Sequence, residues 1–155
     1  MIGIRKATVS DAQQLVFLLQ GIGWFDSFDG GSVDALTSQV QARLEQCLAD
    51  DSHLVLVAED ADGKIAAYSS VHWLPYLFMA GPEGYVSELF VSVTARGRGV
   101  GRELLKTVES AARARGCQRL SLTNLRNRES YQRQFYTKAG WRERSEAANF
   151  IYPLS

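Results

Sequence analysis

Residues 85–105 read YVSELFVSVTARGRGVGRELL. The first ten residues alternate in polarity, which predicts a strand from Tyr85 to Thr94. This strand leads directly into a glycine-rich turn, Arg96–Gly101, and then into a helix that ends at Gly116. Because side chains alternate across a strand, one face carries Leu89, Val91 and Val93, and the other carries Val86, Glu88, Phe90 and Ser92.

The glycine-rich turn predicts an anion site. A turn that joins a strand to a helix presents unpaired backbone N–H groups together with the positive end of the helix dipole. Its glycines let a ligand come close to the backbone, and Arg96, Arg98 and Arg102 add positive charge. Residues 96–102 are therefore expected to bind a phosphate.

The spacing of the glycines argues against two common nucleotide sites. Dinucleotide-binding proteins require G-x-G-x-x-G, but here Gly101 is followed by Arg102, and no acidic residue lies near position 120 to hold a ribose. The phosphate loop of nucleotide hydrolases requires G-x-x-x-x-G-K-[ST], which the turn lacks. A turn that only connects two elements seldom carries three glycines and three arginines in seven residues, so a phosphate ligand of another kind is expected.

Hydrophobic periodicity and turn residues predict the other elements. A capping box at Ser10 and Gln13 opens a first helix, and Ser32 caps a second. The expected order is a strand near residues 2–7, these two helices, a hairpin of strands His53–Glu59 and Lys64–Trp73, the strand, turn and helix described above, a strand at Arg119–Leu125, a helix from Asn127 to Gly140 and a last strand at Phe150–Leu154. This order predicts a mixed α/β fold in a single domain, residues 1–155.

The composition places the chain among globular proteins. Of its 155 residues, 46% are apolar, which is enough for one sizeable core. No apolar run approaches the roughly 20 residues of a membrane helix, and the first residues lack the apolar segment of a secretory signal. Cys47 and Cys117 belong to no CxxC pair, so neither a disulfide framework nor a metal site is expected. We therefore expect a cytoplasmic protein without a metal.

The net charge of zero conceals two oppositely charged parts. Residues 1–95 hold four lysines and arginines against twelve aspartates and glutamates, a net charge of −8, whereas residues 96–155 hold thirteen against five, a net charge of +8. The basic part suits a polyanion, which could be a phosphorylated cofactor or a nucleic acid. No nucleic-acid recognition motif is visible, so we expect no nucleic-acid partner.

Two motifs resemble those of the GCN5-related N-acetyltransferase (GNAT) family. Arg96, Gly99 and Gly101 match the family signature [Q/R]-x-x-G-x-[G/A] in the strand-to-helix context. Residues 135–141, FYTKAGW, resemble the family element [LF]-Y-x-x-x-G-[FYW]. The resemblance covers nearly the whole chain. It implies a mostly antiparallel sheet that splays at its fourth strand and is flanked by four helices.

The resemblance also implies that acetyl-CoA is the acyl donor. In this family the pantetheine arm pairs with the fourth strand, and the pyrophosphate lies on the following turn. Carried over to this sequence, the cofactor-binding residues are Phe90, Val91, Val93, Arg96, Gly97, Arg98, Gly99, Val100, Gly101 and Arg102. The chain departs from the family at Val93, where proline is frequent, and at Glu129, where asparagine is frequent; Asn124 or Asn127 could replace that asparagine.

Acetyl transfer needs a base for the amine, a polarised carbonyl and a proton for the departing thiolate. Tyr136 matches the family's tyrosine and is expected to supply that proton. Glu88 shares a strand face with Phe90 and is the expected base, with His72 as the alternative. The resemblance implies an oxyanion donor among the backbone N–H groups near Val91. Neither cysteine is placed as a nucleophile, so direct transfer in a ternary complex is expected.

The acceptor is expected to be a small-molecule or peptide amine. In the family it enters from the side of the first two helices, where this chain has carboxylates and aromatic rings that suit a cation. The residues in question are Asp26, Asp29, Asp34 and Glu83, with Trp24, Phe25, Phe28, Trp73, Tyr76 and Phe78. A membrane partner is not expected, a homodimer is left open, and a non-catalytic module that binds acetyl-CoA is the alternative function.

Overall fold

The computed structural model describes residues 1–155. The chain divides into two compact units, Met1–Ser121 and Leu122–Ser155. None of the helices is both long enough and apolar enough to cross a membrane.

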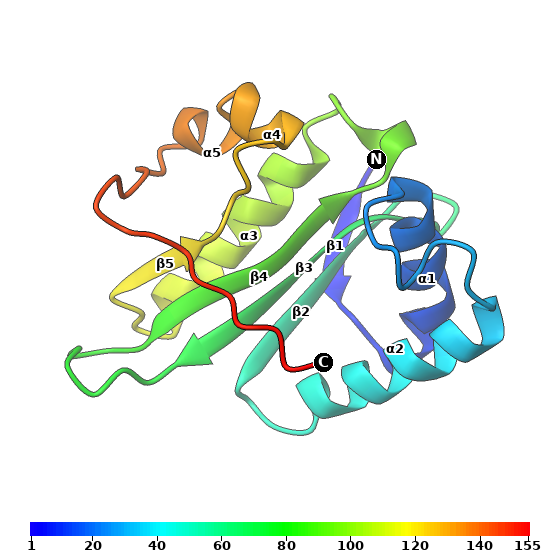
Figure 1. Ribbon diagram of the computed structural model, residues 1–155, viewed down its shortest axis with the longest axis horizontal. Helices are drawn as coiled ribbons and strands as arrows, with labels where there is room; N and C mark the ends of the chain where they lie inside the picture. Colours follow the sequence, from blue (N-terminus) through cyan, green and yellow to red (C-terminus); the bar gives the residue numbers. More distant parts are fainter. The chain divides into compact units, whose positions relative to one another are not determined.

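The first unit is built on one sheet with the strand order β1-β2-β3-β4-β5 (Figure 1). Neighbouring strands are antiparallel from β1 to β4 and parallel at β4–β5. The elements in chain order are β1 (Gly3–Lys6), the 3-10 helix η1 (Val9–Asp11), α1 (Ala12–Ile22), α2 (Val33–Leu48), β2 (His53–Glu59), β3 (Ile65–Leu74), β4 (Glu83–Val91), the 3-10 helix η2 (Val93–Ala95), α3 (Val100–Ala114) and β5 (Arg119–Leu122). The predicted mixed α/β fold class is confirmed.

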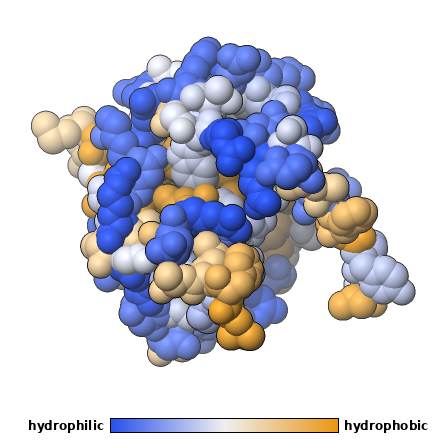
Figure 2. All heavy atoms as spheres, turned by 90° about the vertical axis from the view of Figure 1, so that its left-hand side faces the viewer, coloured by the Kyte–Doolittle hydropathy of each residue, from blue (hydrophilic) through white to orange (hydrophobic).

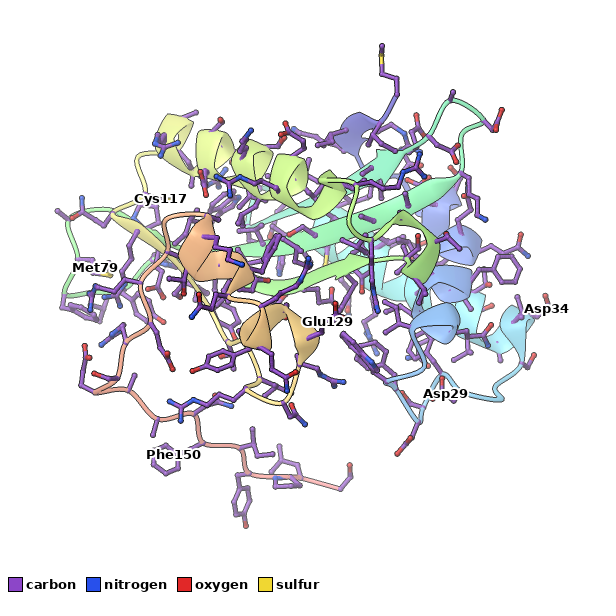
Figure 3. All side chains as sticks on the ribbon, turned by 90° about the horizontal axis from the view of Figure 1, so that it is seen from above. Asp29, Asp34, Met79, Cys117, Glu129 and Phe150 are labelled. Carbon is purple, nitrogen blue, oxygen red and sulfur yellow. The ribbon has the colours of Figure 1, made fainter.

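Helices cover both faces of this sheet (Figures 1 and 3). On one face α1 and α2 pack against Val55, Val57 and Tyr68 in a continuous apolar cluster. On the other face lies α3, whose Leu104, Leu105 and Val108 are fully buried. Burial of apolar area on both faces is the main stabilising contribution to this unit.

The first helix begins differently from the prediction. The capping box forms between Thr8 and Asp11, not between Ser10 and Gln13: the Thr8 N–H donates to Asp11 Oδ2 at 2.8 Å. Asp11 is chosen because Arg5 on β1 also donates to its carboxylate, at 2.8 and 2.9 Å. The predicted cap of α2 is confirmed, since Ser32 Oγ accepts from the Ala35 N–H at 3.4 Å.

Strand β4 is shorter and less regular than predicted. It ends at Val91, and Val93 lies in η2 instead of continuing the strand. A bulge interrupts its pairing with β3: Glu88 pairs with Ser70 and Val86 with Val71, so Ser87 is an extra residue. The predicted alternation therefore breaks at this point, and Val86 and Glu88 lie on opposite faces.

The second unit contains two one-turn helices, α4 (Glu129–Gln132) and α5 (Phe135–Lys138). The predicted single helix is wrong, because Gln134 between them adopts φ 58° in the left-handed region. Arg128, not Asn127, is the residue that precedes α4. The predicted end at Gly140 is confirmed as a left-handed turn with φ 95°.

The predicted last strand at Phe150–Leu154 does not form. The second unit has no further strand beside this segment, and Pro153 removes one backbone donor.

Figure 2 shows a mainly hydrophilic face with separate apolar areas. The large apolar side chains that are more than three-quarters exposed include Leu77, Phe78, Phe150, Ile151 and Leu154.

Candidate active site

The turn before α3 has the geometry of an anion site. Gly97 and Gly99 both adopt left-handed backbone, with φ 75° and 79°, and Gly99 caps α3. The first turn of a helix has no intrahelical acceptors for its N–H groups, and here Gly97, Arg98 and Gly99 before this turn are exposed. A Cβ at either glycine would touch nothing within 4 Å, so glycine is required by the backbone conformation and not by packing. The arrangement offers backbone donors and helix-dipole charge to one anion.

Beside this turn, the C-terminal part of β4 extends beyond the end of its neighbour β5. The pairing of these strands starts where the Gln118 N–H donates to the Pro82 carbonyl at 2.8 Å, and β5 has only four residues against nine in β4. The Ser92 N–H donates to Ala66 on β3 at 2.8 Å. Since successive N–H groups point to opposite edges, the Val91 N–H points toward the β5 side. An extended ligand could pair with β4 at this edge.

Glu88, the predicted base, lies on the β4 face that is turned toward α1 and α2. Glu88 is exposed to solvent, but nearby protein groups remove part of the hydration of its carboxyl and so raise its pKa. Tyr68 on β3, which lies on the same sheet face, lowers the pKa of the Glu88 carboxyl and so opposes that rise. On the α2 side, burial and then the charge of Glu88 raise the pKa of the Cys47 thiol, so this cysteine is kept as a thiol.

His72, the alternative base, shares this sheet face with Glu88. Register places Glu88 opposite Ser70, two residues before His72. His72 Nε2 lies 2.7 Å from Ser87 Oγ, and its ring packs at 4.5 Å from the ring of His53. Burial and then His53 lower the pKa of His72, which favours the neutral imidazole. Both candidate bases therefore lie along one strip of the sheet.

An aromatic group surrounds Phe90 on the same face. The ring centroids of Trp24, Phe25 and Tyr68 lie 6.1, 5.3 and 5.8 Å from that of Phe90. Arg96 from the anion turn stacks over Trp24 at 5.5 Å. The loop after α1 thus contacts both the predicted pantetheine strand and the predicted phosphate turn, a link that the sequence analysis did not anticipate.

Some residues that were predicted to form the acceptor surface do not face solvent. Glu83 is only 3% exposed and pairs with Arg119, so its charge serves an internal ion pair. Trp73 is buried as well, and Phe25 and Phe28 pack against the apolar cluster instead of facing solvent. The exposed carboxylates that remain are Asp26, Asp29 and Asp34; Figure 3 labels Asp29 in the loop between α1 and α2 and Asp34 in the first turn of α2.

Tyr136, the predicted proton donor, lies in α5 of the second unit. Its ring packs edge-on against Phe135 at 4.9 Å and lies 5.9 Å from the ring of Trp141. Burial raises the pKa of Tyr136 to about 12, so its hydroxyl carries a proton at any physiological pH. In the same unit Asn124 donates to Ser130 Oγ at 2.9 Å.

Comparison with known proteins gives the family. Residues 23–141 match the sequence model described as the acetyltransferase (GNAT) family. This chain belongs to that family. The match confirms the predicted resemblance, and it includes the anion turn, the C-terminal part of β4 and Tyr136.

Two curated relatives of this GNAT chain are N-acetyltransferases. Glucosamine 6-phosphate N-acetyltransferase 1 of Oryza sativa subsp. japonica is 35% identical over 108 residues, which cover 68% of this chain and 63% of the rice protein. Aminoglycoside N(6')-acetyltransferase type 1 of Stenotrophomonas maltophilia is 30% identical over 155 residues, which cover 97% of this chain and 93% of that protein. The predicted enzyme class, N-acetyltransferase, is confirmed at the level of these relatives.

A solved structure shows the shared fold. The crystal structure of a transcriptional regulator from Bacillus halodurans C-125 matches with a TM-score of 0.85 and 24% identity, over 98% of this chain and 100% of that chain. GNAT enzymes use acetyl-CoA. The left-handed glycines, the helix N-terminus and the neighbouring arginines fit the pyrophosphate of that co-substrate.

Proposed function

We propose that this GNAT protein transfers the acetyl group of acetyl-CoA to a primary amine of an amino sugar. The observation that carries this proposal is the anion turn, in which Gly97 and Gly99 open the N-terminus of α3 to a phosphate. The turn lies inside the part of the chain that matches the family, residues 23–141. That match also runs across both structural units, which supports one catalytic domain over residues 1–155.

The cofactor would be held by backbone groups. The turn Arg96–Arg102 would bind the pyrophosphate, with the arginine side chains adding charge. The edge of β4 at Phe90 and Val91 would pair with the pantetheine arm, and Val93 in η2 would contact it beyond the strand end. The Val91 N–H, which points to this edge, would polarise the thioester carbonyl.

The transfer itself would be direct. Glu88 would accept a proton from the amine, whose nitrogen attacks the thioester carbonyl and forms the amide bond. The carbon–sulfur bond then breaks, and Tyr136 would protonate the departing thiolate to give free CoA. The raised pKa values support both roles, since burial makes Glu88 a stronger base and keeps Tyr136 protonated.

The acceptor class rests on the relatives and on charge. The names of the rice and Stenotrophomonas relatives specify glucosamine 6-phosphate and an aminoglycoside, both of which are amino sugars. Asp26 and Asp29 are exposed in the loop after α1, Asp34 is exposed in the first turn of α2, and Trp24 of the same loop is partly exposed. Carboxylates next to an aromatic face favour a cation, so a cationic amino sugar fits this chain better than a phosphorylated one.

A panel of amines with free CoA release as the readout tests the proposal. Amino sugars are expected to release CoA, and Glu88→Gln is expected to lower kcat by at least about 100-fold because general-base catalysis is lost. Glu45→Gln, on an exposed position of α2, is the matched control and should leave kcat unchanged. Binding of acetyl-CoA without CoA release from any amine would contradict the proposal and favour a non-catalytic acetyl-CoA-binding module.

A further inference from the structure

Tyr68 is a buried polar side chain next to the proposed base. It lies on β3, is only 4% exposed, and belongs to the apolar cluster beneath α1 and α2. Its Cα pairs directly with that of Phe90, and the two rings lie 5.8 Å apart at an angle of 55°. Packing on these sides fixes the direction of the Tyr68 ring and therefore the position of its hydroxyl.

The side chain of Tyr68 lies on the same sheet face as the carboxylate of Glu88, and each of the two groups shifts the pKa of the other. Glu88 precedes Phe90 by two residues on the same strand face, which makes it the diagonal cross-strand neighbour of Tyr68. Diagonal neighbours are about 7 to 8 Å apart at Cα, a distance that aromatic and long side chains span. Burial raises the pKa of Tyr68 well above its usual range, so this hydroxyl remains a donor whenever Glu88 is ionised.

The other polar groups near Glu88 are Ser70, Cys47 and His72, and the Cα of the buried Ser70 pairs directly with that of Glu88. Cys47 faces it from α2 and stays a neutral thiol, since burial and the Glu88 charge raise its pKa. His72 lies on the same sheet face, two residues along β3 from Ser70, which pairs with Glu88. Its ring contacts Ser87 Oγ and the ring of His53. The loop after α1 contributes Trp24 and Phe25, which do not titrate. Of these neighbours, Tyr68 is the one that lowers the pKa of the Glu88 carboxyl.

We propose that Tyr68 is a positioning residue that holds the carboxylate of Glu88 in place and keeps it ionised for proton transfer from the acceptor amine. This inference rests on the proposed function, in which Glu88 is the base. Tyr68 itself touches neither substrate. Its hydroxyl stabilises the charged carboxylate against the cost of partial burial, because a hydrogen bond to the ionised form favours that form.

The proposal fixes the sign of a pH effect. Loss of the Tyr68 hydroxyl removes the interaction that lowers the pKa of Glu88 and leaves the burial that raises it. The acidic limb of the kcat/KM profile reports the base of the free enzyme. In Tyr68→Phe this limb should therefore move to higher pH, while the apolar packing of the ring is kept.

The experiment compares kcat/KM profiles with one acceptor, so that the amine's own ionisation is the same throughout. Tyr68→Phe should show the displaced limb, and Tyr85→Phe, which removes a hydroxyl from the neighbouring strand, should not. In a Glu88→Gln background, Tyr68→Phe should change kcat/KM by less than about twofold, because the residue acts through Glu88. An undisplaced limb, or an equal loss with and without Glu88, would overturn the positioning role.

A second variant covers the case in which Tyr68→Phe does not fold. Site-specific 3-fluorotyrosine at position 68 keeps the hydroxyl and makes it a stronger donor, so the limb should move to lower pH. The experiment distinguishes a wrong assignment of Glu88 as the base from a wrong role for Tyr68. If Glu88→Gln retains wild-type kcat, the proposed base is wrong; if Glu88→Gln is impaired but neither Tyr68 variant moves the limb, only the role of Tyr68 is wrong.

Discussion

At the scale of single residues, burial shifts the pKa values of the two residues that we propose for proton transfer. Glu88 and Tyr136 belong to different units, yet burial raises the pKa of both. The same shift has opposite uses. A carboxylate with a raised pKa is a better proton acceptor at neutral pH, whereas a phenol with a raised pKa keeps the proton that a thiolate needs.

Tyr136→Phe is expected to lower kcat by about 100-fold and to leave the Kd for acetyl-CoA within about twofold. The hydroxyl is needed mainly as the thiolate departs, so its loss affects the transition state more than the bound state. Because the pKa of Tyr136 is about 12, the wild-type enzyme should show no basic limb from this group below about pH 11. Pre-steady-state CoA release measures the chemical step. Tyr131→Phe is the matched control, since Tyr131 hydrogen-bonds Glu143 elsewhere in the same unit. A loss of less than about threefold in Tyr136→Phe would return this residue to a packing role.

At the scale of elements, local patterns predicted the hairpin, the strand-turn-helix and the helix ends at Ser32 and Gly140. Each of these depends on a few adjacent residues. The start of α1 was missed because Asp11 is selected by Arg5 on β1, which is a tertiary contact. No glycine or proline marks the break at Gln134. In the candidate site, the anion turn followed from local sequence, whereas the placement of Tyr68 beside Glu88 depends on the register of β3 and β4, which sequence alone does not reveal.

The ion pair at the start of α1 should be a strong local contribution to stability. Asp11 is buried and accepts hydrogen bonds from Thr8 and Arg5 at 2.8 Å. Arg5 lowers the pKa of Asp11 and burial raises it, and the net effect is a lowered pKa. A lowered folded-state pKa stabilises the protein above the ordinary pKa of Asp, and this stabilisation is lost as the pH falls through the folded value. Asp11→Asn should therefore reduce the free energy of unfolding by about 2 to 3 kcal/mol at pH 7.

Urea denaturation at several pH values tests this expectation. The difference between wild type and Asp11→Asn should shrink as the pH falls below about 4, because the wild-type carboxylate then becomes protonated. Asp34→Asn, on an exposed position of α2, should cost less than about 1 kcal/mol. A difference that stays constant down to pH 3 would show that shape rather than charge matters at Asp11.

The anion turn is tested by Gly99→Glu. The substitution places a negative side chain where the pyrophosphate should bind, so acetyl-CoA should no longer raise the melting temperature. Gly63→Glu is the matched control: Gly63 lies in the β2–β3 turn with φ 76°, and a Cβ there also meets nothing within 4 Å. Both variants carry the same backbone strain and the same added charge. If both, or neither, lose the acetyl-CoA-dependent shift in melting temperature, the turn is not the cofactor site.

At the scale of the whole molecule, the distribution of charge separates two tasks. The net charge of +8 in residues 96–155 includes the arginines of the anion turn, and the net charge of −8 in residues 1–95 includes the exposed carboxylates after α1. A polyanionic donor and a cationic acceptor would each meet a part of the chain with the opposite charge. Glu83 pairs with Arg119 and so adds no free charge to the acceptor surface, but the charge of residues 1–95 remains strongly negative without it.

The last prediction follows from this charge separation. A cationic amino sugar should have a higher kcat/KM than a matched amino sugar that carries a phosphate, because long-range attraction raises the encounter rate and cation–π contact stabilises the complex. Salt screens exposed charges over about 10 Å at 0.1 M, so the preference should shrink at least severalfold between 20 mM and 500 mM NaCl. Asp29→Asn with Asp26→Asn should reduce the preference at low salt, whereas Asp62→Asn in the β2–β3 turn should not. A preference for the phosphorylated amine, or equal rates that do not respond to salt, would mean that the acidic surface has no part in acceptor choice.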